Sequence, residues 1–375
     1  EMCDSDWSSD VCSSDLLAVA GQARGDAGDA LGFLAASPLG RGWLGEAVPV
    51  EAAGPVRVGL DLALPLAPQA GGPPQVEGRV ALSGVTAALP PWLRLGALSG
   101  SLAFDEAGIH HGRLSARWGG EPASLTVETE RVAGRRRIVL EGRGRGTPAS
   151  LLAAVAADPP WWQGRSAWSV RAELPGFQSP PAARAVQLTA TSQLQGAALE
   201  LPAPFALGRR QARELRVDVG FTRRGLSSYW LRYGDRLRAG AAAGPGGWPR
   251  AAAVRLGGGA PRLPAAGLVV SGRLERLDVG RWGRWLARQA GGEGAEAAPA
   301  PLGRLALMPL SVDVRVGELR IGGRGYGPHR LALAASERRG GRAALEGDWA
   351  GGQAAWTADG RVLRATLDHL DVPLS

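Results

Sequence analysis

The chain has 375 residues, of which 45% are hydrophobic, and its 43 basic and 35 acidic side chains give a formal net charge of +8. Every basic side chain in that count is arginine and asparagine is absent, which is typical of a GC-rich coding sequence, so the excess of arginine does not by itself indicate nucleic-acid binding. The sequence contains no run of 18 apolar residues, so this segment predicts no membrane-spanning helix.

The first sixteen residues differ in composition from the rest of the chain. They contain both cysteines, Cys3 and Cys12, which could form a small disulfide loop in an oxidising compartment. The stretch from Trp7 to Leu16 also matches the translation of a common sequencing-adapter oligonucleotide, and we favour this second interpretation. Residues 1–16 are then non-native and contribute nothing to the fold. Without their five carboxylates the formal charge of +8 becomes +13, and the remaining chain has no cysteine for a disulfide, a thiolate or a metal site.

Alternation of apolar and polar side chains dominates the rest of the sequence. It predicts strands with one apolar and one polar face at 54–66, 112–118, 169–174, 214–221 and 311–321. Such alternation is typical of antiparallel sheets, because parallel strands that are covered on both faces have continuous runs of apolar residues. The apolar faces of four of these strands carry Val56, Val58, Leu60, Leu62, Leu64, Leu114, Trp118, Leu215, Val217, Val219, Phe221, Val312, Val314 and Val316.

Helices are predicted to be few and short. Two candidate helices lie at 28–40 and 147–158. In the second, Thr147 is the N-cap and Pro148 occupies the first helical position. A third lies at 277–292, with Asp278 as its N-cap and with Trp282, Trp285 and Leu286 on one stripe.

The domain organisation follows from these elements. The pattern predicts an elongated, twisted, antiparallel open β-groove, with segments 17–146, 147–290 and 302–375 and a flexible loop at 291–301.

No motif predicts a catalytic or metal site. His110 and His111 are adjacent, so on a strand they point to opposite faces and make a poor chelate. Residues 137–155 imitate a dinucleotide-binding turn, but the glycines at 142, 144 and 146 have the wrong spacing, and a strand that leads into a short helix is the favoured interpretation. We therefore expect no enzyme activity, no metal and no cofactor.

Two other features have a simple structural interpretation. The arginines lie singly along polar strand faces without an aromatic RNA-binding motif, which favours a solvated sheet surface over a nucleic-acid site. Most tryptophans are expected to pack in a core or at an edge, and Trp161–Trp162 is the pair that could instead form an interfacial contact.

Several stretches resemble a known family when they are taken in order. These are 30–66, 76–109, "VQLTATSQLQGAALELPAPFALGRRQA" at 186–212, "LERLDVGRWGRWL" at 274–286, and 309–333 with its "LRIGG" turn. The series is similar to the YhdP family of AsmA-like proteins and covers nearly all of residues 17–375. The "LPAPFALGRRQA" stretch departs from the family pattern by an insertion and by arginine in place of lysine, and this departure affects no catalytic residue.

The resemblance implies a periplasmic β-groove, anchored in the inner membrane outside this fragment, that carries phospholipid toward the outer membrane. Family members are longer, so the chain is expected to be an interior or late fragment. The implied partners are phospholipid acyl chains, the inner and outer membranes and other envelope proteins, but not nucleic acid. The fourteen apolar residues named above are then the candidates that line the groove.

A second hypothesis remains open at this point. The same alternating strands could close as sandwich cores in a structural or assembly-scaffold protein of the envelope that conducts no lipid. Both hypotheses require period-two strands, so the sequence pattern does not decide between them.

Overall fold

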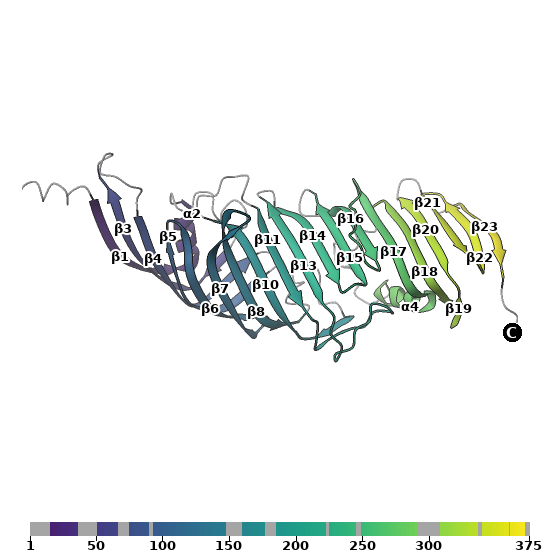
Figure 1. The fold of residues 1–375 in the computed structure, drawn as a ribbon, viewed down its shortest axis with the longest axis horizontal. Coiled ribbons are helices and arrows are strands. Elements are labelled where there is room, and N and C mark those ends of the chain that lie inside the picture. Colours follow the sequence, from purple (N-terminus) through teal and green to yellow (C-terminus); the bar gives the residue numbers. More distant parts are fainter. Residues whose placement is uncertain are drawn as a thin grey trace, which may run out of the picture. The chain divides into compact units, whose positions relative to one another are not determined.

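A computed structural model gives the structure of residues 16–36, 51–66, 75–89, 93–147, 160–176, 185–222, 225–244, 249–290, 308–336, 340–359 and 361–371. The chain divides into two compact units, which are described separately. Unit 1 comprises residues 1–145 and 169–188, and unit 2 comprises 146–168 and 189–375. Figure 1 gives the labels of the elements in both units.

Unit 1 is an antiparallel meander. Its strands are β1 (Leu16–Asp26), β2 (Glu51–Ala53), β3 (Pro55–Pro65), β4 (Gln75–Leu89), β5 (Leu93–Asp105), β6 (Gly108–Trp118), β7 (Glu121–Val132), β8 (Arg135–Gly146) and part of β10 (Ser166–Pro175). Each strand from β3 to β7 pairs with the next along the chain, β1 pairs with β3, β2 pairs with β4, and β10 pairs with β8. Tight turns join the hairpins at 106–107 and 133–134, where the sequence reads "DEAG" and "VAGR".

The helix of unit 1 is fixed at its N-terminus by one carboxylate. Helix α2 (Ala27–Ala36) follows β1 directly, and the Asp26 carboxylate accepts hydrogen bonds from the Gly28 N–H at 2.8 Å and from the Gly54 N–H at 2.7 Å. One side chain thereby caps the helix and ties it to the start of β3. Ala27 is buried with Val56, Val85 and other apolar side chains in the core of this unit.

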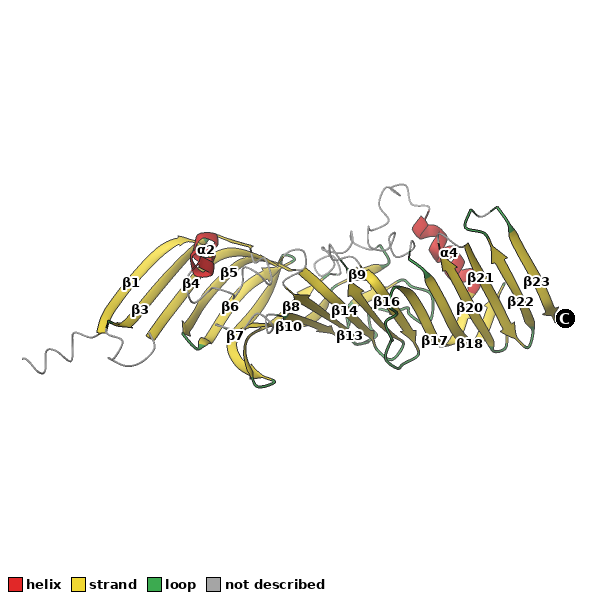
Figure 2. Cartoon of the chain, turned by 90° about the horizontal axis from the view of Figure 1, so that it is seen from above, coloured by secondary structure: helices red, strands yellow, loops and turns green. Residues whose placement is uncertain are grey.

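Unit 2 contains a longer series of paired strands. They are part of β11 (Val186–Ser192), β13 (Leu215–Thr222), β14 (Gly225–Tyr233), β15 (Leu237–Ala243), β16 (Pro249–Leu256), β17 (Gly267–Asp278), β18 (Leu310–Ile321), β19 (Arg324–Tyr326), β20 (His329–Ser336), β21 (Gly340–Gly347), β22 (Ala350–Trp356) and β23 (Leu363–Leu370). A separate two-stranded sheet joins β9 (Trp162–Gly164) to β12 (Ala197–Leu199). Figure 2 shows the strands of unit 2 running side by side as an open layer.

Three neighbouring strands of unit 2 depart from the antiparallel pattern. Strand β16 pairs with β17 in parallel, and β17 pairs with β18 in parallel, whereas the remaining pairs of this sheet with a determined register are antiparallel. Parallel neighbours need a crossover connection, and the segment between β17 and β18 contains helix α4 (Val279–Ala290). Its N-cap is Asp278, as the sequence predicts, because the Asp278 carboxylate accepts the Arg281 N–H at 2.8 Å.

The strand-dominated, mostly antiparallel open fold is confirmed. The alternating segments at 54–66, 112–118, 169–174, 214–221 and 311–321 all lie on strands, and the helices predicted near 28–40 and 277–292 are present as α2 and α4. The predicted helix at 147–158 and the predicted loop at 291–301 fall almost wholly outside the described residues. Strand β1 begins at Leu16, the last residue of the segment that we expect to be non-native.

The strands also decide the interpretation of the glycine motif at 142–146. The glycines at 142, 144 and 146 lie within β8, so this stretch is a strand and not the phosphate-binding turn that it imitates. His110 lies on β6, and its Nε2 is 2.6 Å from the Asp105 carboxylate in the same hairpin. Within the described residues, no group of three or more His, Cys, Asp or Glu side chains could hold a metal ion. Neither α2 nor α4, the helices of the described part of the chain, is long and apolar enough to cross a membrane.

Candidate functional site: one apolar sheet face in each unit

The strand register of unit 2 aligns apolar side chains in a row across ten strands. We call this the central row of unit 2, and the face of the sheet that carries it the apolar face. The central row runs Val217, Leu231, Ala239, Val254, Val270, Val312, Leu333, Ala343, Ala354 and Ala365. Because side chains alternate across a strand, one fixed register is sufficient to keep every member of the row on the same face.

The central row of unit 2 is partly exposed along its whole length. Each member from Val217 to Ala354 is half-buried, and Ala365 is exposed. The rows on either side include deeply buried positions, such as Val219 at 1% and Val314 at 4% exposure. The apolar face therefore has side chains that remain partly accessible along a continuous line.

Unit 1 has a row of the same kind. Its central row is Ala23, Val58, Val80, Leu102, Gly112, Val127 and Leu140, one residue from each of seven strands. Val58, Val80, Leu102 and Leu140 are half-buried, Ala23 is exposed, and Val127 is buried. The apolar face of unit 1 is therefore also open to contact from outside along part of its length.

The structure distributes the predicted lining residues between two levels of burial. Eight of them are buried among protein side chains: Val56, Leu114, Trp118, Leu215, Val219, Phe221, Val314 and Val316. Five are half-buried and can touch a molecule lying on the apolar face: Val58, Leu60, Leu62, Val217 and Val312. The side chain of Leu64 is outside the described residues. Within each unit, register brings the predicted residues of separate strands onto one face, as with Val217 of β13 and Val312 of β18.

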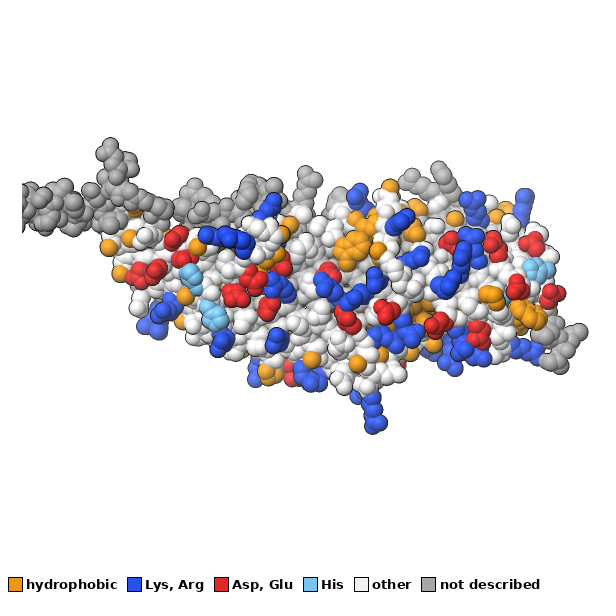
Figure 3. Space-filling model, in the orientation of Figure 1, with side chains coloured by type: hydrophobic (Ala, Val, Ile, Leu, Met, Phe, Trp, Pro, Cys, Tyr) orange, Lys and Arg blue, Asp and Glu red, His pale blue; other side chains and the backbone are white. Residues whose placement is uncertain are grey.

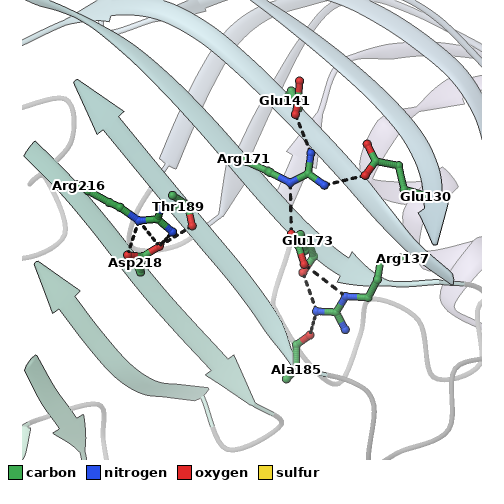
Figure 4. Close-up of polar contacts among 9 residues, drawn as sticks. All are labelled: Glu130, Arg137, Glu141, Arg171, Glu173, Ala185, Thr189, Arg216 and Asp218. Atoms are coloured by element: carbon green, nitrogen blue, oxygen red, sulfur yellow. Dashed lines mark hydrogen bonds and ion pairs between the residues drawn. The ribbon is translucent and has the colours of Figure 1, made fainter. Parts of the chain in front are cut away.

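The opposite face of each sheet is charged. In Figure 3, arginine side chains and carboxylates are interspersed over the visible surface of both units. In unit 1, Arg171 on β10 donates to Glu130 on β7 and Glu141 on β8, each at 2.7 Å, and to Glu173 at 3.2 Å (Figure 4). The hydrogen bond from Arg171 to Glu130 is the main reason that the pKa of the guanidinium is raised. This network links three strands on the polar side of the sheet.

A second polar group joins two strands of unit 2. The Asp218 carboxylate on β13 accepts hydrogen bonds from Arg216 Nε at 2.8 Å and from the Thr189 hydroxyl on β11 at 2.6 Å (Figure 4). Burial raises the pKa of Asp218, but the hydrogen bonds from Arg216 and Thr189 outweigh it, so the pKa lies below its ordinary value.

Replacement of Asp218 by asparagine should destabilise the chain in a pH-dependent way. A carboxylate whose folded-state pKa is lowered contributes stability above its unfolded pKa of about 3.9, and the contribution is lost as the pH falls through the folded value. We expect Asp218→Asn to lower the free energy of unfolding by about 1 kcal/mol at neutral pH, and by less in acid. Urea unfolding at neutral pH and near pH 3 measures the difference. The matched control is Asp348→Asn, at an exposed side chain, and a deficit for Asp218→Asn that is equal at both pH values would contradict this account.

An aromatic cluster packs helix α4 onto unit 2. Trp282 lies 6.0 Å from Phe205 and 5.7 Å from Trp285, measured between ring centroids, and Trp285 lies 6.4 Å from Trp161. Trp162 stacks beside Trp161 and is 9% exposed. The packing interpretation of these tryptophans is therefore correct, and the Trp161–Trp162 pair takes part in the interior of unit 2.

Leu286 does not share the environment of the two tryptophans on α4. Its side chain is 56% exposed, although the sequence predicts one stripe with Trp282 and Trp285. The cluster reaches only the side of the helix that carries the two indole rings, so the packed stripe is narrower than predicted.

Comparison with known proteins agrees with these observations. The model of a family described as YhdP protein matches residues 10–375. The chain belongs to the YhdP family. A search of the curated proteins and a search of the solved structures gave no match. Membership of the YhdP family and the open sheet together fit a protein of the cell envelope.

The family match extends into the segment that we expect to be non-native, because it begins at residue 10.

The site residues that sequence reasoning missed in this YhdP-family chain are those of strands with short or weak alternation. Leu231, Val254, Val270 and Leu333 belong to the central row, in which the small residue Ala239 stands between Leu231 and Val254 and the small residue Ala343 follows Leu333. In these strands the alternation extends over only a few apolar side chains, which is a weak signal in the sequence. Strand pairing was needed to show that these residues share one face.

Proposed function

We propose that the apolar faces of this YhdP-family chain bind phospholipid acyl chains and form part of a hydrophobic path between the inner and outer membranes. The observation that carries the proposal is the central row of unit 2, which is apolar on ten strands and half-buried at all members but the exposed Ala365. An apolar strip that stays accessible in water is unfavourable unless another apolar molecule covers it.

Acyl chains have the shape and chemistry that such a strip requires. Each methylene group that leaves water contributes about 0.8 kcal/mol, so a chain of ordinary length is held firmly by apolar contact alone. Successive members of the central row, such as Val254, Val270 and Val312, are nearly equivalent in chemistry. A lipid that moves from one to the next exchanges similar contacts, so strong retention is compatible with movement along the row.

The charges on the opposite face of each sheet also favour binding of acyl chains to the apolar face. The Arg171 network and the Arg216–Asp218 pair lie on the opposite side of each sheet, where acyl chains could not solvate their charges. We infer that the chain works in the periplasm as part of a longer protein anchored in the inner membrane, without catalytic activity, and that other envelope proteins contact it.

Site-specific photo-crosslinking tests the proposal. Leu333 belongs to the central row, whereas its neighbour Ala332 pairs with Asp313 on the charged face. A photoreactive amino acid at position 333 should crosslink to phospholipid when the protein is irradiated with vesicles, and the same amino acid at position 332 should not. Absence of a lipid adduct at 333, or equal adducts at both positions, would contradict lipid binding and leave the scaffold function.

A further inference from the structure

The charged face of unit 2 has an unusual row of arginines. Arg216, Arg232, Arg238 and Arg255 occupy directly paired positions on β13, β14, β15 and β16. Like charges that face each other across strands destabilise a sheet, so each guanidinium needs a compensating group. Two of the four have one, since Arg216 pairs with Asp218 and Arg232 pairs with Glu214.

The other half of the row lacks carboxylate partners. Among the described residues, neither Arg238 nor Arg255 forms an ion pair, and the Nε of Arg238 is buried without a hydrogen-bond partner. The same holds for Arg273 on β17 and Arg315 on β18, which are paired with each other and form no ion pair with any described carboxylate. Four guanidinium groups without an ion-pair partner among the described residues therefore lie on four consecutive strands.

Three of these arginines line one hollow. Its walls and floor are Arg255, Leu256, Gly257, Ser271, Gly272, Arg273, Asp313 and Arg315. Asp313 is the one carboxylate among them, and Arg330 already holds it through hydrogen bonds of 2.9 and 3.0 Å. Arg255 Nη1 lies 3.4 Å from the Ser271 hydroxyl, so a guanidinium and a hydroxyl meet inside the hollow.

Two glycines keep the floor of the hollow open. Gly257 has φ +71° and Gly272 has φ +131°, which are conformations that L-residues with a side chain rarely adopt. A Cβ at Gly257 would lie 2.5 Å from the Arg273 carbonyl oxygen, and one at Gly272 would lie 2.1 Å from the Leu256 carbonyl oxygen. The backbones of β16 and β17 approach so closely here that a side chain on either residue is excluded.

We propose that this hollow on the charged face is a binding site for a phosphate group. Guanidinium groups present several N–H donors in a fixed fork that matches phosphate oxygens, and the Ser271 hydroxyl adds one more donor. Asp313 offsets part of the charge of Arg315 but is held by Arg330, and no other described carboxylate lines the hollow, so a bound anion reduces the repulsion that remains between Arg255, Arg273 and Arg315. The source of the phosphate is either a soluble phosphate or the headgroup of a lipid at a membrane surface.

The site does not depend on the proposed lipid path. It lies on the face of the sheet opposite the central row, as the alternation of Val270 with Ser271 and of Val312 with Asp313 shows. Val217→Asp, which places a charge on the apolar face, should therefore leave phosphate affinity unchanged, so failure of one proposal can be distinguished from failure of the other.

Isothermal titration calorimetry with inorganic phosphate, at constant ionic strength, tests the site in the whole chain. Arg273→Gln and Arg315→Gln should each weaken binding at least about tenfold, which corresponds to one lost charge-assisted contact of about 1.4 kcal/mol. The matched control is Arg342→Gln, which removes the same charge from an exposed side chain of β21 outside the hollow and should change affinity less than about twofold. No phosphate binding by the parent chain, or equal losses in all three variants, would overturn the proposal.

Vesicle flotation then separates the two sources. If a lipid headgroup is the source, Arg315→Gln should reduce binding to phosphatidylglycerol vesicles and excess inorganic phosphate should compete with the parent chain. If a soluble phosphate is the source, the calorimetric loss should remain while vesicle binding is the same for the parent and for Arg315→Gln. Either result supports the site when the calorimetric loss is present, and without that loss both sources are ruled out.

Discussion

Replacement of Val219 by aspartate is expected to unfold unit 2 or to destabilise it by about 4 kcal/mol, the largest effect among the substitutions considered. Val219 is 1% exposed and pairs with Tyr229, so a carboxylate at this position loses its water without gaining a partner. It must either take up a proton or force the surrounding packing open, and both responses cost free energy. The midpoint and slope of urea unfolding, followed by circular dichroism, measure the loss.

Val217→Asp is the matched comparison on the same strand and face. Val217 is half-buried and belongs to the central row, so a carboxylate there keeps much of its hydration. We expect a loss of only about 1 kcal/mol, together with reduced phospholipid binding, because acyl chains cannot solvate the charge. Equal destabilisation by the two substitutions would show that the central row is closed in a core, as the scaffold hypothesis requires.

Replacement of Trp282 by alanine is expected to release helix α4 from unit 2. The indole ring contacts Phe205 and Trp285 through edge-to-face packing, and it is half-buried. Loss of this area and of two aromatic contacts should lower the free energy of unfolding by about 3 kcal/mol, toward the lower end of the range for buried aromatic residues. Tryptophan fluorescence should also change, since Trp285 loses a neighbour within 6 Å.

Leu286→Ala on the same helix provides the control. Its side chain is 56% exposed, so its removal should change stability by less than about 0.5 kcal/mol. Because alanine favours helix at least as well as leucine and tryptophan do, both substitutions act through the packing that they remove. A similar loss for Leu286→Ala and Trp282→Ala would contradict the claim that the aromatic cluster holds α4 in place.

Local pattern was enough to predict the type of some elements, namely strands β3, β6, β10, β13 and β18 and helices α2 and α4. Alternation over Val56–Leu62 and over Val312–Val316 identifies strands with one apolar face, because that period belongs to the extended backbone alone. Asp278 identifies the start of α4, since the cap uses only a side chain and a backbone N–H three residues away. Such signals are contained within a few residues, which is why they can be read from the sequence.

The remaining features depend on pairing between distant segments. The parallel pairs of β16, β17 and β18 could not be predicted, because β17 alternates over Val270 and Leu274 as an antiparallel strand does. The central row and the arginine hollow also depend on the register between strands, which the sequence does not show. Arg255, Arg273 and Arg315 look like isolated solvated side chains in the sequence, and only register places them around one hollow.

Phospholipid bound to the purified chain is the most direct test of the central claim that the apolar faces hold acyl chains. Native mass spectrometry of the protein isolated from membranes, with lipid extraction of the same sample, measures the number and identity of bound lipids. The account predicts phospholipid on the parent chain, at least about tenfold less on folded Val217→Asp, and no change on Arg342→Gln. A folded parent chain that carries no phospholipid, even after incubation with vesicles, would contradict it.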